Sequence, residues 1–235
     1  MKESIIKVEN LSKEYRLGEV RVNALAEASF DIFEGEFVVI LGPSGSGKST
    51  LLNIIGGMDT ATGGKAFLRE EEITAMNEGQ LTEYRKNKVG FVFQFYNLMS
   101  NLTAEENIEL STELSKDPLN IEEVLQAIGL LERRDHFPSQ LSGGEQQRIS
   151  IARAIAKNPE IILCDEPTGA LDFTTGITVL SLLKKLNEEM NKTVIVITHN
   201  SAIADMADRV IKLGSGRIVE NHVNEKVIRP EEVVW

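Results

Sequence analysis

Short apolar runs alternate with helix-like patterns along the chain, and this alternation predicts the fold class. Four runs read as strands, and each leads into a glycine or a polar residue: FVVILG (37–42), KVGFVFQ (88–94), EIILCDE (160–166) and TVIVITH (193–199). Strands separated by helical segments are typical of a mostly parallel sheet covered by helices, so we predict an α/β protein. Parallel strands end at one edge of such a sheet, and we expect the chemistry to gather there.

The strand pattern stops between Phe95 and Asn158, which predicts an inserted helical lobe. Apolar residues of IEEVLQAIGL fall on one helical face there, namely Ile121, Val124, Leu125 and Ile128. The first forty residues read as strands of a small antiparallel sheet attached to the core. We therefore predict a single domain, with a core of about 1–94 and 159–220, a helical subdomain of about 95–158, and a short tail, 221–235.

Composition and charge limit the size of the core and the kinds of partner. The 235 residues, 42% of them apolar, can bury one sizeable core. With 25 basic and 36 acidic residues the net charge is −11, which opposes non-specific binding to nucleic acid or to an anionic membrane. The sequence shows no apolar run of signal-peptide or membrane-spanning length. We therefore expect a cytoplasmic chain that reaches a membrane only through a protein partner.

A glycine-rich loop carries the first candidate site. The segment GPSGSGKST fits the pattern G-x-x-x-x-G-K-S, follows an apolar strand and begins a helix. Its glycines let backbone N–H groups and the helix dipole face phosphate oxygens. Lys48 adds a charge near the terminal phosphates, and the Ser49 hydroxyl can bind Mg²⁺. The predicted nucleotide contacts in this loop are Gly42, Pro43, Ser44, Gly45, Ser46, Gly47, Lys48, Ser49 and Thr50.

Two adjacent carboxylates, Asp165 and Glu166, follow the predicted strand IILC. Neighbouring side chains of a strand point to opposite sides, so the two should have different tasks. Asp165 suits the Mg²⁺ shell, as the strand-borne partner of a phosphate loop, which leaves Glu166 to orient and deprotonate an attacking water. Alone, the pair would equally fit a solvated strand end, but the phosphate loop favours the catalytic interpretation.

Three more side chains can reach a bound nucleotide. His199 ends a predicted strand and can donate to the transferring phosphoryl group, although a histidine there also fits a strand cap. Gln94 can touch Mg²⁺ and the attacking water, although a lone glutamine more often lies at a polar surface. Tyr15 can stack on a purine ring or simply pack against its neighbours.

A second glycine-rich segment, LSGGEQQR, begins a predicted helix at residues 141–148. Ser142 and Glu145 form a capping box, which explains those two residues. It does not explain Gly143 and Gly144, since a glycine inside a helix costs about 0.5–1 kcal/mol relative to alanine. Exposed amides at a helix amino terminus favour an anion. Because the phosphate loop already has a full set of ligands, we predict that this segment reaches the nucleotide of another subunit.

Taken together, GPSGSGKST, Gln94, LSGGEQQR, IILCDEP, GALD and His199 resemble, in this order and spacing, the ATPase subunit of an ABC transporter. The resemblance implies a P-loop NTPase core of RecA type, two subunits stacked head to tail around two ATP molecules, and Mg²⁺. It implies Tyr15 on adenine, Gln94 as metal and water sensor, and Glu166 as general base. It further implies His199 on the γ-phosphate, Asp172 as a link between the two sites, and Ser142 with Gly144 on the partner's γ-phosphate. Gly143 and Glu145 complete the predicted nucleotide-binding residues of this segment. Glu145 stands where glutamine is common.

Within this family, the sequence is similar to ATPases of the macrolide-exporter and lipoprotein-release type. Three segments show this similarity: GGMDTATGGKAF, GFVFQFYNLMSNLTAEENI and FPSQLSGGEQQR. It implies a membrane permease and export or extraction of a peptide, antibiotic or lipoprotein. Two alternatives stay open. One is a soluble ABC ATPase acting on nucleic acid or ribosomes, which usually carries coiled coils, a duplicated cassette or basic patches. The other is an ATPase that controls a membrane partner without cargo, such as a cell-wall hydrolase or a sensor kinase.

The stretch after Gln94 predicts where the permease docks, near residues 94–107. Phe95, Tyr96, Leu98 and Met99 form an apolar cluster at the start of the helical lobe. Such clusters usually pack internally and mark partner grooves only when exposed. We expect a short cytoplasmic helix of the permease to insert here, beside a glutamine that senses ATP.

Overall fold

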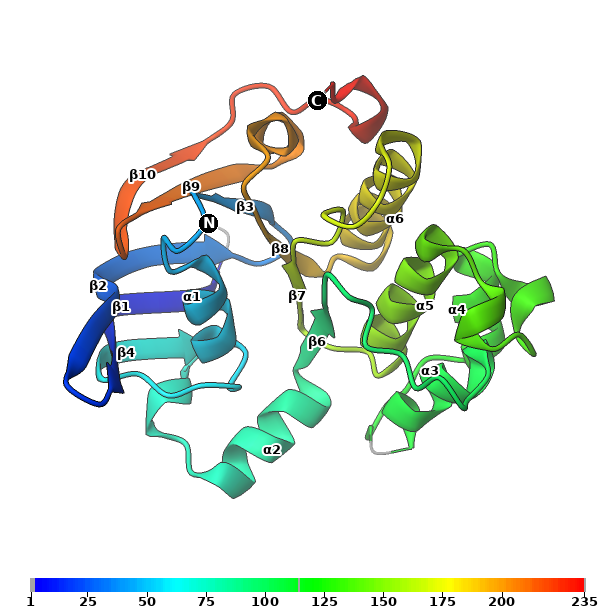
Figure 1. Ribbon diagram of the computed structural model, residues 1–235, viewed down its shortest axis with the longest axis horizontal. Helices are drawn as coiled ribbons and strands as arrows, with labels where there is room; N and C mark the ends of the chain where they lie inside the picture. Colours follow the sequence, from blue (N-terminus) through cyan, green and yellow to red (C-terminus); the bar gives the residue numbers. More distant parts are fainter. Residues whose placement is uncertain (1–2, 114, 235) are drawn as a thin grey trace.

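A six-stranded sheet forms the centre of the computed structural model, which describes residues 3–113 and 115–234 (Figure 1). Its strand order is β10-β9-β3-β8-β7-β6, and neighbours run parallel except for the antiparallel pair β9 and β10. The predicted α/β class with a mostly parallel sheet is therefore confirmed. The strands are β3 (Phe37–Leu41), β6 (Val89–Val92), β7 (Ile161–Asp165), β8 (Thr193–Thr198), β9 (Arg209–Gly214) and β10 (Arg217–Val223).

A separate antiparallel sheet, in blue and cyan in Figure 1, is built from the amino-terminal part of the chain, as predicted. Its order is β2-β1-β4-β5. Helix α1 (Lys48–Ile55) packs between this sheet and the central one. The strands are β1 (Ser4–Leu17), β2 (Val20–Phe33), β4 (Gly63–Leu68) and β5 (Glu71–Glu72).

Both faces of the central sheet are buried, which explains why its strands read as continuous apolar runs. In β3, Phe37, Val39 and Leu41 join one hydrophobic cluster, which also includes residues of α5 and α6. Val38 and Ile40 point the other way, into a second cluster with α1 and the antiparallel sheet. The side-chain alternation of a strand thus supplies both layers of the core from the same run.

The predicted helical lobe is present between β6 and β7, and lies to the right in Figure 1. Val124, Leu125 and Ile128 of the predicted apolar face are buried in this lobe, and Ile121 packs against the same cluster. The helices of the chain are α1, α2 (Glu78–Asn87), α3 (Ala104–Thr112), α4 (Ile121–Ala127), α5 (Gly143–Ala156) and α6 (Phe173–Met190). Short 3-10 turns are Ile73–Ala75, Leu131–Arg133, Pro138–Gln140, Ser201–Met206 and Pro230–Glu232.

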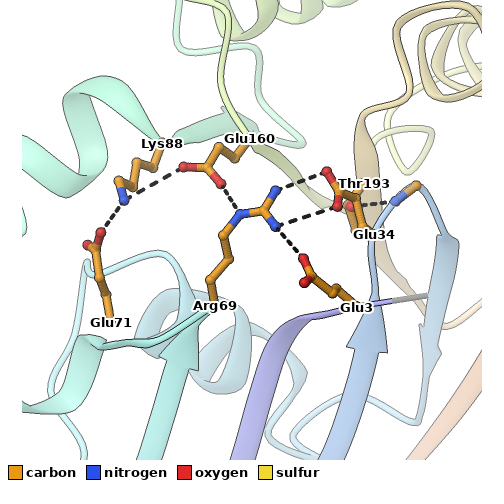
Figure 2. Close-up of polar contacts among 8 residues, drawn as sticks. Glu3, Glu34, Arg69, Glu71, Lys88, Glu160 and Thr193 are labelled. Atoms are coloured by element: carbon orange, nitrogen blue, oxygen red, sulfur yellow. Dashed lines mark hydrogen bonds and ion pairs between the residues drawn. The ribbon is translucent and has the colours of Figure 1, made fainter. Parts of the chain in front are cut away.

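An ion-pair network joins the antiparallel sheet to the amino-terminal edge of the central sheet (Figure 2). Arg69, in the turn between β4 and β5, donates to Glu34 and to Glu160, each at 2.9 Å. Lys88 bridges Glu160 to Glu71. The two carboxylates raise the pKa of Arg69. Because Glu160 precedes β7 while Asp165 ends it, this network lies at the edge opposite the candidate site.

The carboxyl-terminal segment turns back onto α6. Strand β10 continues to Val223, beyond the predicted start of the tail at residue 221. Ser181 Oγ on α6 donates to Glu231 at 2.7 Å, and Val233 is buried. In the described part of the chain, every helix is too short or too polar to cross a membrane.

Candidate active site

A cavity of about 640 Å³ opens where the parallel strands end. It brings together most of the residues that the sequence predicted, because β3, β6, β7 and β8 all finish at this edge. Val22, Asn23 and Ala24 of β2 also line the cavity and were not predicted. The predicted residues in the lining are Tyr15, Ser44, Gly45, Gly47, Lys48, Ser49, Thr50, Gln94, Asp165, Glu166 and His199.

The phosphate loop between β3 and α1 has a backbone that glycine adopts most easily. Gly45 and Gly47 have φ angles of +77° and +102°, and a Cβ on Gly47 would lie 2.2 Å from the carbonyl oxygen of Ala24. Helix α1 begins at Lys48, and its N-cap residue, Gly47, has no side chain to cap it, so the N–H groups of the first turn are left for another acceptor. Among the described residues, the buried Ser46 hydroxyl has no hydrogen-bond partner. This loop fits a phosphate chain.

Lys48 is almost fully buried within the loop. Its Nζ donates to the carbonyl oxygens of Gly42, at 2.7 Å, and Pro43, at 3.0 Å. Among the described residues its hydrogen-bond acceptors are these two neutral carbonyls, and Lys48 interacts with Asp165 only through its charge. A buried ammonium group with so little compensation favours an incoming anion.

Ser49 and Asp165 provide oxygen ligands of the kind that Mg²⁺ prefers. Ser49 Oγ donates to Asp165 Oδ1 at 3.5 Å, and burial raises the pKa of the Asp165 carboxyl. Across residues 3–113 and 115–234, no group of three or more His, Cys, Asp or Glu side chains could hold a metal. Mg²⁺ usually needs only one or two carboxylates because substrate phosphates complete its shell. The residues therefore fit a Mg²⁺ that arrives with a nucleotide.

Glu166 lies directly beyond the end of β7 and is held by two neighbours from the end of β8. Its Oε1 is 2.9 Å from His199 Nδ1, and its Oε2 accepts a hydrogen bond from Thr198 Oγ1 at 3.1 Å. Its backbone has a φ of 47°, an uncommon conformation for a residue with a side chain. Sequence reasoning missed Thr198, since a threonine at the end of an apolar strand gives no distinguishing signal.

Gln147 was also missed, although it lies within LSGGEQQR. It is fully buried on α5, and its Nε2 donates to the carbonyl oxygen of Pro167 at 2.8 Å. Pro167 follows Glu166 directly, so Gln147 connects the helical lobe to the loop that carries the candidate base. A glutamine on the buried face of α5 is the signal that could have identified it, because a buried polar side chain usually has a hydrogen-bond partner.

Tyr15 lines the cavity at the end of β1, with partners that fix its ring. Its hydroxyl donates to Asp59 at 2.6 Å, and Lys13 Nζ lies 4.8 Å from the ring centroid. Lys13 in turn donates to Asp59 at 2.6 Å. The ring therefore has an oriented position beside the phosphate loop.

The signature loop, defined here as Leu141–Arg148, lies outside this cavity, since the cavity lining includes none of its residues. Its predicted capping box is confirmed: Glu145 N donates to Ser142 Oγ at 3.3 Å and Ser142 N donates to Glu145 Oε2 at 2.8 Å. Ser142 is exposed, whereas Gly144 is buried. A Cβ on Gly144 would lie 2.2 Å from Thr175 Cγ2, so packing against α6 already accounts for that glycine.

Asp172 also lies outside the cavity lining and begins α6 as its N-cap. It accepts hydrogen bonds from Thr175 N, at 3.1 Å, and from Thr175 Oγ1, at 2.6 Å. These bonds lower the pKa of the Asp172 carboxyl. Within one chain, capping explains this residue; its role as a link between two sites stays a prediction.

The apolar cluster after Gln94 divides into two parts. Phe95 and Met99 are 75% and 52% exposed, as a docking surface requires. Tyr96 and Leu98 are half-buried, and Leu98 packs against the core of the lobe. Phe95 and Met99 therefore offer a partner more accessible apolar surface than Tyr96 and Leu98 do.

Known proteins with similar sequences and structures give an independent view of this site. The family model described as ABC transporter matches residues 25–169. An uncharacterised ABC transporter ATP-binding protein of Thermotoga maritima is 48% identical, over 91% of this chain and 93% of its own length. The macrolide export ATP-binding/permease protein MacB of Brucella abortus is 43% identical, over 98% of this chain and 37% of its own length. A dimeric structure of the ATP-binding cassette MJ0796 of Methanocaldococcus jannaschii, in a post-hydrolysis state bound to ADP and Pi, resembles this chain with a TM-score of 0.84. The sequences are 44% identical, and the match covers 93% of this chain and 98% of that chain.

Proposed function

The chain belongs to the ABC transporter family as an ATP-binding subunit that hydrolyses ATP, and on this premise we propose that two copies close head to tail around two ATP molecules. Each ATP lies between the phosphate loop of one copy and the signature loop of the other. The dimer drives a separate membrane permease for export or extraction of a peptide, antibiotic or lipoprotein. It lies on the cytoplasmic face of the membrane through that permease.

The position of Ser142 carries the proposal. Its hydroxyl is exposed at the amino terminus of α5, a 14-residue helix, and it lies outside the cavity that its own phosphate loop lines. A second copy could bring its phosphate loop to this hydroxyl, which is the arrangement that we propose. The dimeric structure of MJ0796 supports pairing, and the name of MacB, which joins ATP binding to a permease, supports a membrane partner.

We propose that the phosphate loop and Lys48 hold the β- and γ-phosphates of ATP. The Lys48 ammonium would exchange its carbonyl partners for phosphate oxygens. Ser49, Asp165 and Gln94 would hold Mg²⁺, which neutralises phosphate charge as the terminal phosphoryl group leaves. Tyr15, held by Asp59, would stack on the adenine ring.

Glu166 is the proposed general base. Its carboxylate would orient the attacking water and accept its proton, while Thr198 and His199 hold it in place. His199 Nδ1 lies against Glu166, and its side chain is 64% exposed. To donate to the γ-phosphate, the ring would either carry a proton on both nitrogens or release Glu166 and turn its N–H to the phosphate. Gln94, which follows β6 and lines the same cavity, would contact both the metal and the water.

Mass measurement in solution tests the dimer. In a Glu166→Gln background, where hydrolysis cannot dissolve the complex, we expect twice the monomer mass of 26.0 kDa with ATP and the monomer mass with ADP. Adding Ser142→Arg should abolish the dimer but leave ATP binding intact. Gln126→Arg, which adds the same charge to an exposed position of α4, is the matched control and should still dimerise. A monomer with ATP in the Glu166→Gln protein would contradict the sandwich.

Purification of the chain from its own cells in mild detergent tests the membrane partner. We expect a multispan membrane protein in stoichiometric amount, and stimulation of ATP hydrolysis when the complex is placed in lipid. Recovery of ribosomes or nucleic acid in its place would favour the soluble alternative. A membrane complex that hydrolyses ATP without moving any cargo would favour the regulatory one.

A further inference from the structure

A buried amide on α5 contacts the short loop that carries Glu166. The base loop, defined here as residues 166–169, follows β7 directly. Gln147 is fully buried, and its Nε2 donates to the carbonyl oxygen of Pro167 at 2.8 Å. Its Oε1 is also buried and has no hydrogen-bond partner among the described residues. Within the described chain, the bond to the base loop is therefore the one hydrogen bond that this side chain makes.

The backbone of the base loop needs support because it is strained at Glu166. The φ of Glu166 is 47°, and the proline that follows further restricts the backbone of the residue before it. Pro167 has no N–H, so the loop is held at this point through carbonyl oxygens. Gly169 N donates to the carbonyl oxygen of Glu166 at 2.9 Å, and Gln147 donates to that of Pro167. These two bonds hold the two peptide groups that follow the proposed base.

The base loop also lies close to Gln94, the other side chain expected to contact the attacking water. A Cβ on Gly169 would lie 3.0 Å from Gln94 Nε2. Gln94 and Glu166 both line the nucleotide cavity, whereas Gln147 and Pro167 do not. Gln147 therefore supports the loop from outside the cavity.

We propose that Gln147 is a positioning residue for ATP hydrolysis: its hydrogen bond to Pro167 holds the base loop so that the Glu166 carboxylate points at the attacking water. The inference rests on the proposed role of Glu166 as general base. Thr198 and His199 hold the carboxylate itself, and Gln147 holds the backbone that carries it. A small displacement of the base slows the reaction strongly, because proton transfer needs a hydrogen bond to the water.

Gln147→Met tests the inference, because it removes the donor and keeps a side chain of similar length. We expect kcat for ATP hydrolysis to fall by about ten- to a hundredfold, whereas KM for ATP should change by less than about twofold, since Gln147 lies outside the cavity. A kcat near the parent's in Gln147→Met overturns the inference.

Loss of stability needs a matched control, because Gln147→Met also leaves the buried Pro167 carbonyl without its donor. Ile155→Val removes one methylene from the buried face of α5, two turns further along the helix. This control should lower the melting temperature and keep kcat near the parent's. An equal loss of kcat in Ile155→Val would attribute the effect to stability and overturn the positioning role.

A double variant distinguishes positioning from an independent effect on hydrolysis. In a Glu166→Gln background the base is already absent, so Gln147→Met should lower the residual single-turnover rate by less than about twofold. If the residual rate falls by the same factor as in the parent background, Gln147 acts independently of Glu166 and the inference is wrong.

Gln147→Glu adds a test that depends on pH. A neutral carboxyl can still donate to Pro167, whereas an ionised carboxylate cannot, and burial raises the pKa of a carboxyl above its usual value of about 4.3. The ratio of the variant's kcat to the parent's should therefore fall as pH rises through the pKa of the introduced carboxyl. A ratio that does not follow this titration would show that hydrolysis does not need the donor.

Three outcomes separate this inference from the proposed function. Parent-like turnover of Glu166→Gln would refute the proposed base itself. Slow turnover of Glu166→Gln together with parent-like turnover of Gln147→Met overturns the positioning role alone. Gln147→Met in the Glu166→Gln background should still form the dimer with ATP; loss of that dimer would assign Gln147 to the signature loop and overturn its role at the base.

Discussion

Replacement of Gly144 by alanine separates two reasons for a glycine in the signature loop. Within the chain, a Cβ at this position would lie 2.2 Å from Thr175 Cγ2, well inside van der Waals contact. Between chains, the proposed dimer brings the partner's γ-phosphate to the same helix terminus. The methyl of Thr175 cannot easily rotate away, because its hydroxyl donates to Asp172 at 2.6 Å.

The magnitude follows from two opposing effects. Crowding a well-packed contact costs about 1–3 kcal/mol, whereas alanine gains up to about 1 kcal/mol over glycine in a helix. We therefore expect Gly144→Ala to lower the free energy of unfolding by about 1 kcal/mol, and the melting temperature by about 2–4 °C for a chain of this size. Thr175→Ser removes the offending methyl and keeps the hydroxyl. In the double variant, the two changes should couple favourably by about 1–3 kcal/mol.

Thermal and urea unfolding of the four proteins gives the coupling energy, and ATP hydrolysis gives the functional effect. Recovered stability with slow hydrolysis would mean that Gly144 also admits the partner's phosphate. Recovery of both would mean that packing alone requires the glycine. A Gly144→Ala protein as stable as its parent, with no coupling to Thr175→Ser, would refute the steric argument.

Four further predictions follow from single contacts. Glu166→Gln should retain ATP binding but nearly abolish turnover in a phosphate-release assay, since it removes the base and leaves phosphate ligation unchanged. Lys48→Ala should weaken ATP binding itself, measured by calorimetry. Gln147→Leu leaves the Pro167 carbonyl without its donor and should cost about 1–3 kcal/mol in urea unfolding. Burial lowers the pKa of Lys157 to about 8 from 10.5. Between these pH values the unfolded chain binds more protons than the folded chain, so the free energy of unfolding should rise with pH. Urea unfolding across this range should show the rise in the parent and not in Lys157→Met.

The sequence predicted the central sheet and most of the nucleotide cavity because both depend on local patterns. An apolar run that ends at Asp165 and a glycine loop that ends at Lys48 define strand ends, and the parallel rule brings those ends to one edge. Contacts between residues that are far apart in the sequence have no local pattern of this kind. Asp59, which holds Tyr15, lies 44 residues from it, and Arg69 meets Glu160 across 91 residues. Such pairings depend on the packing of whole sheets, which hydrophobic periodicity does not describe.

The division of the apolar cluster after Gln94 shows the same limit. Phe95, Tyr96, Leu98 and Met99 all have large side chains that are mostly apolar, yet two are exposed and two are half-buried. The backbone decides this, because Tyr96 has a φ of 56° and turns the chain at that point. Charge substitutions that test docking therefore belong at Phe95 and Met99, since a charge at Leu98 would enter the core of the lobe.

Gln94 and the turn that follows it link the nucleotide cavity to the helical lobe. Gln94 lines the cavity, whereas its neighbour Phe93 lines a separate groove on the side of the lobe. Arg153 of α5 donates to the carbonyl oxygens of Tyr96 and Asn97, two and three residues after Gln94. A γ-phosphate that displaces Gln94 would therefore act on a turn that a guanidinium group ties to α5, so coupling between the nucleotide and the lobe needs no long pathway.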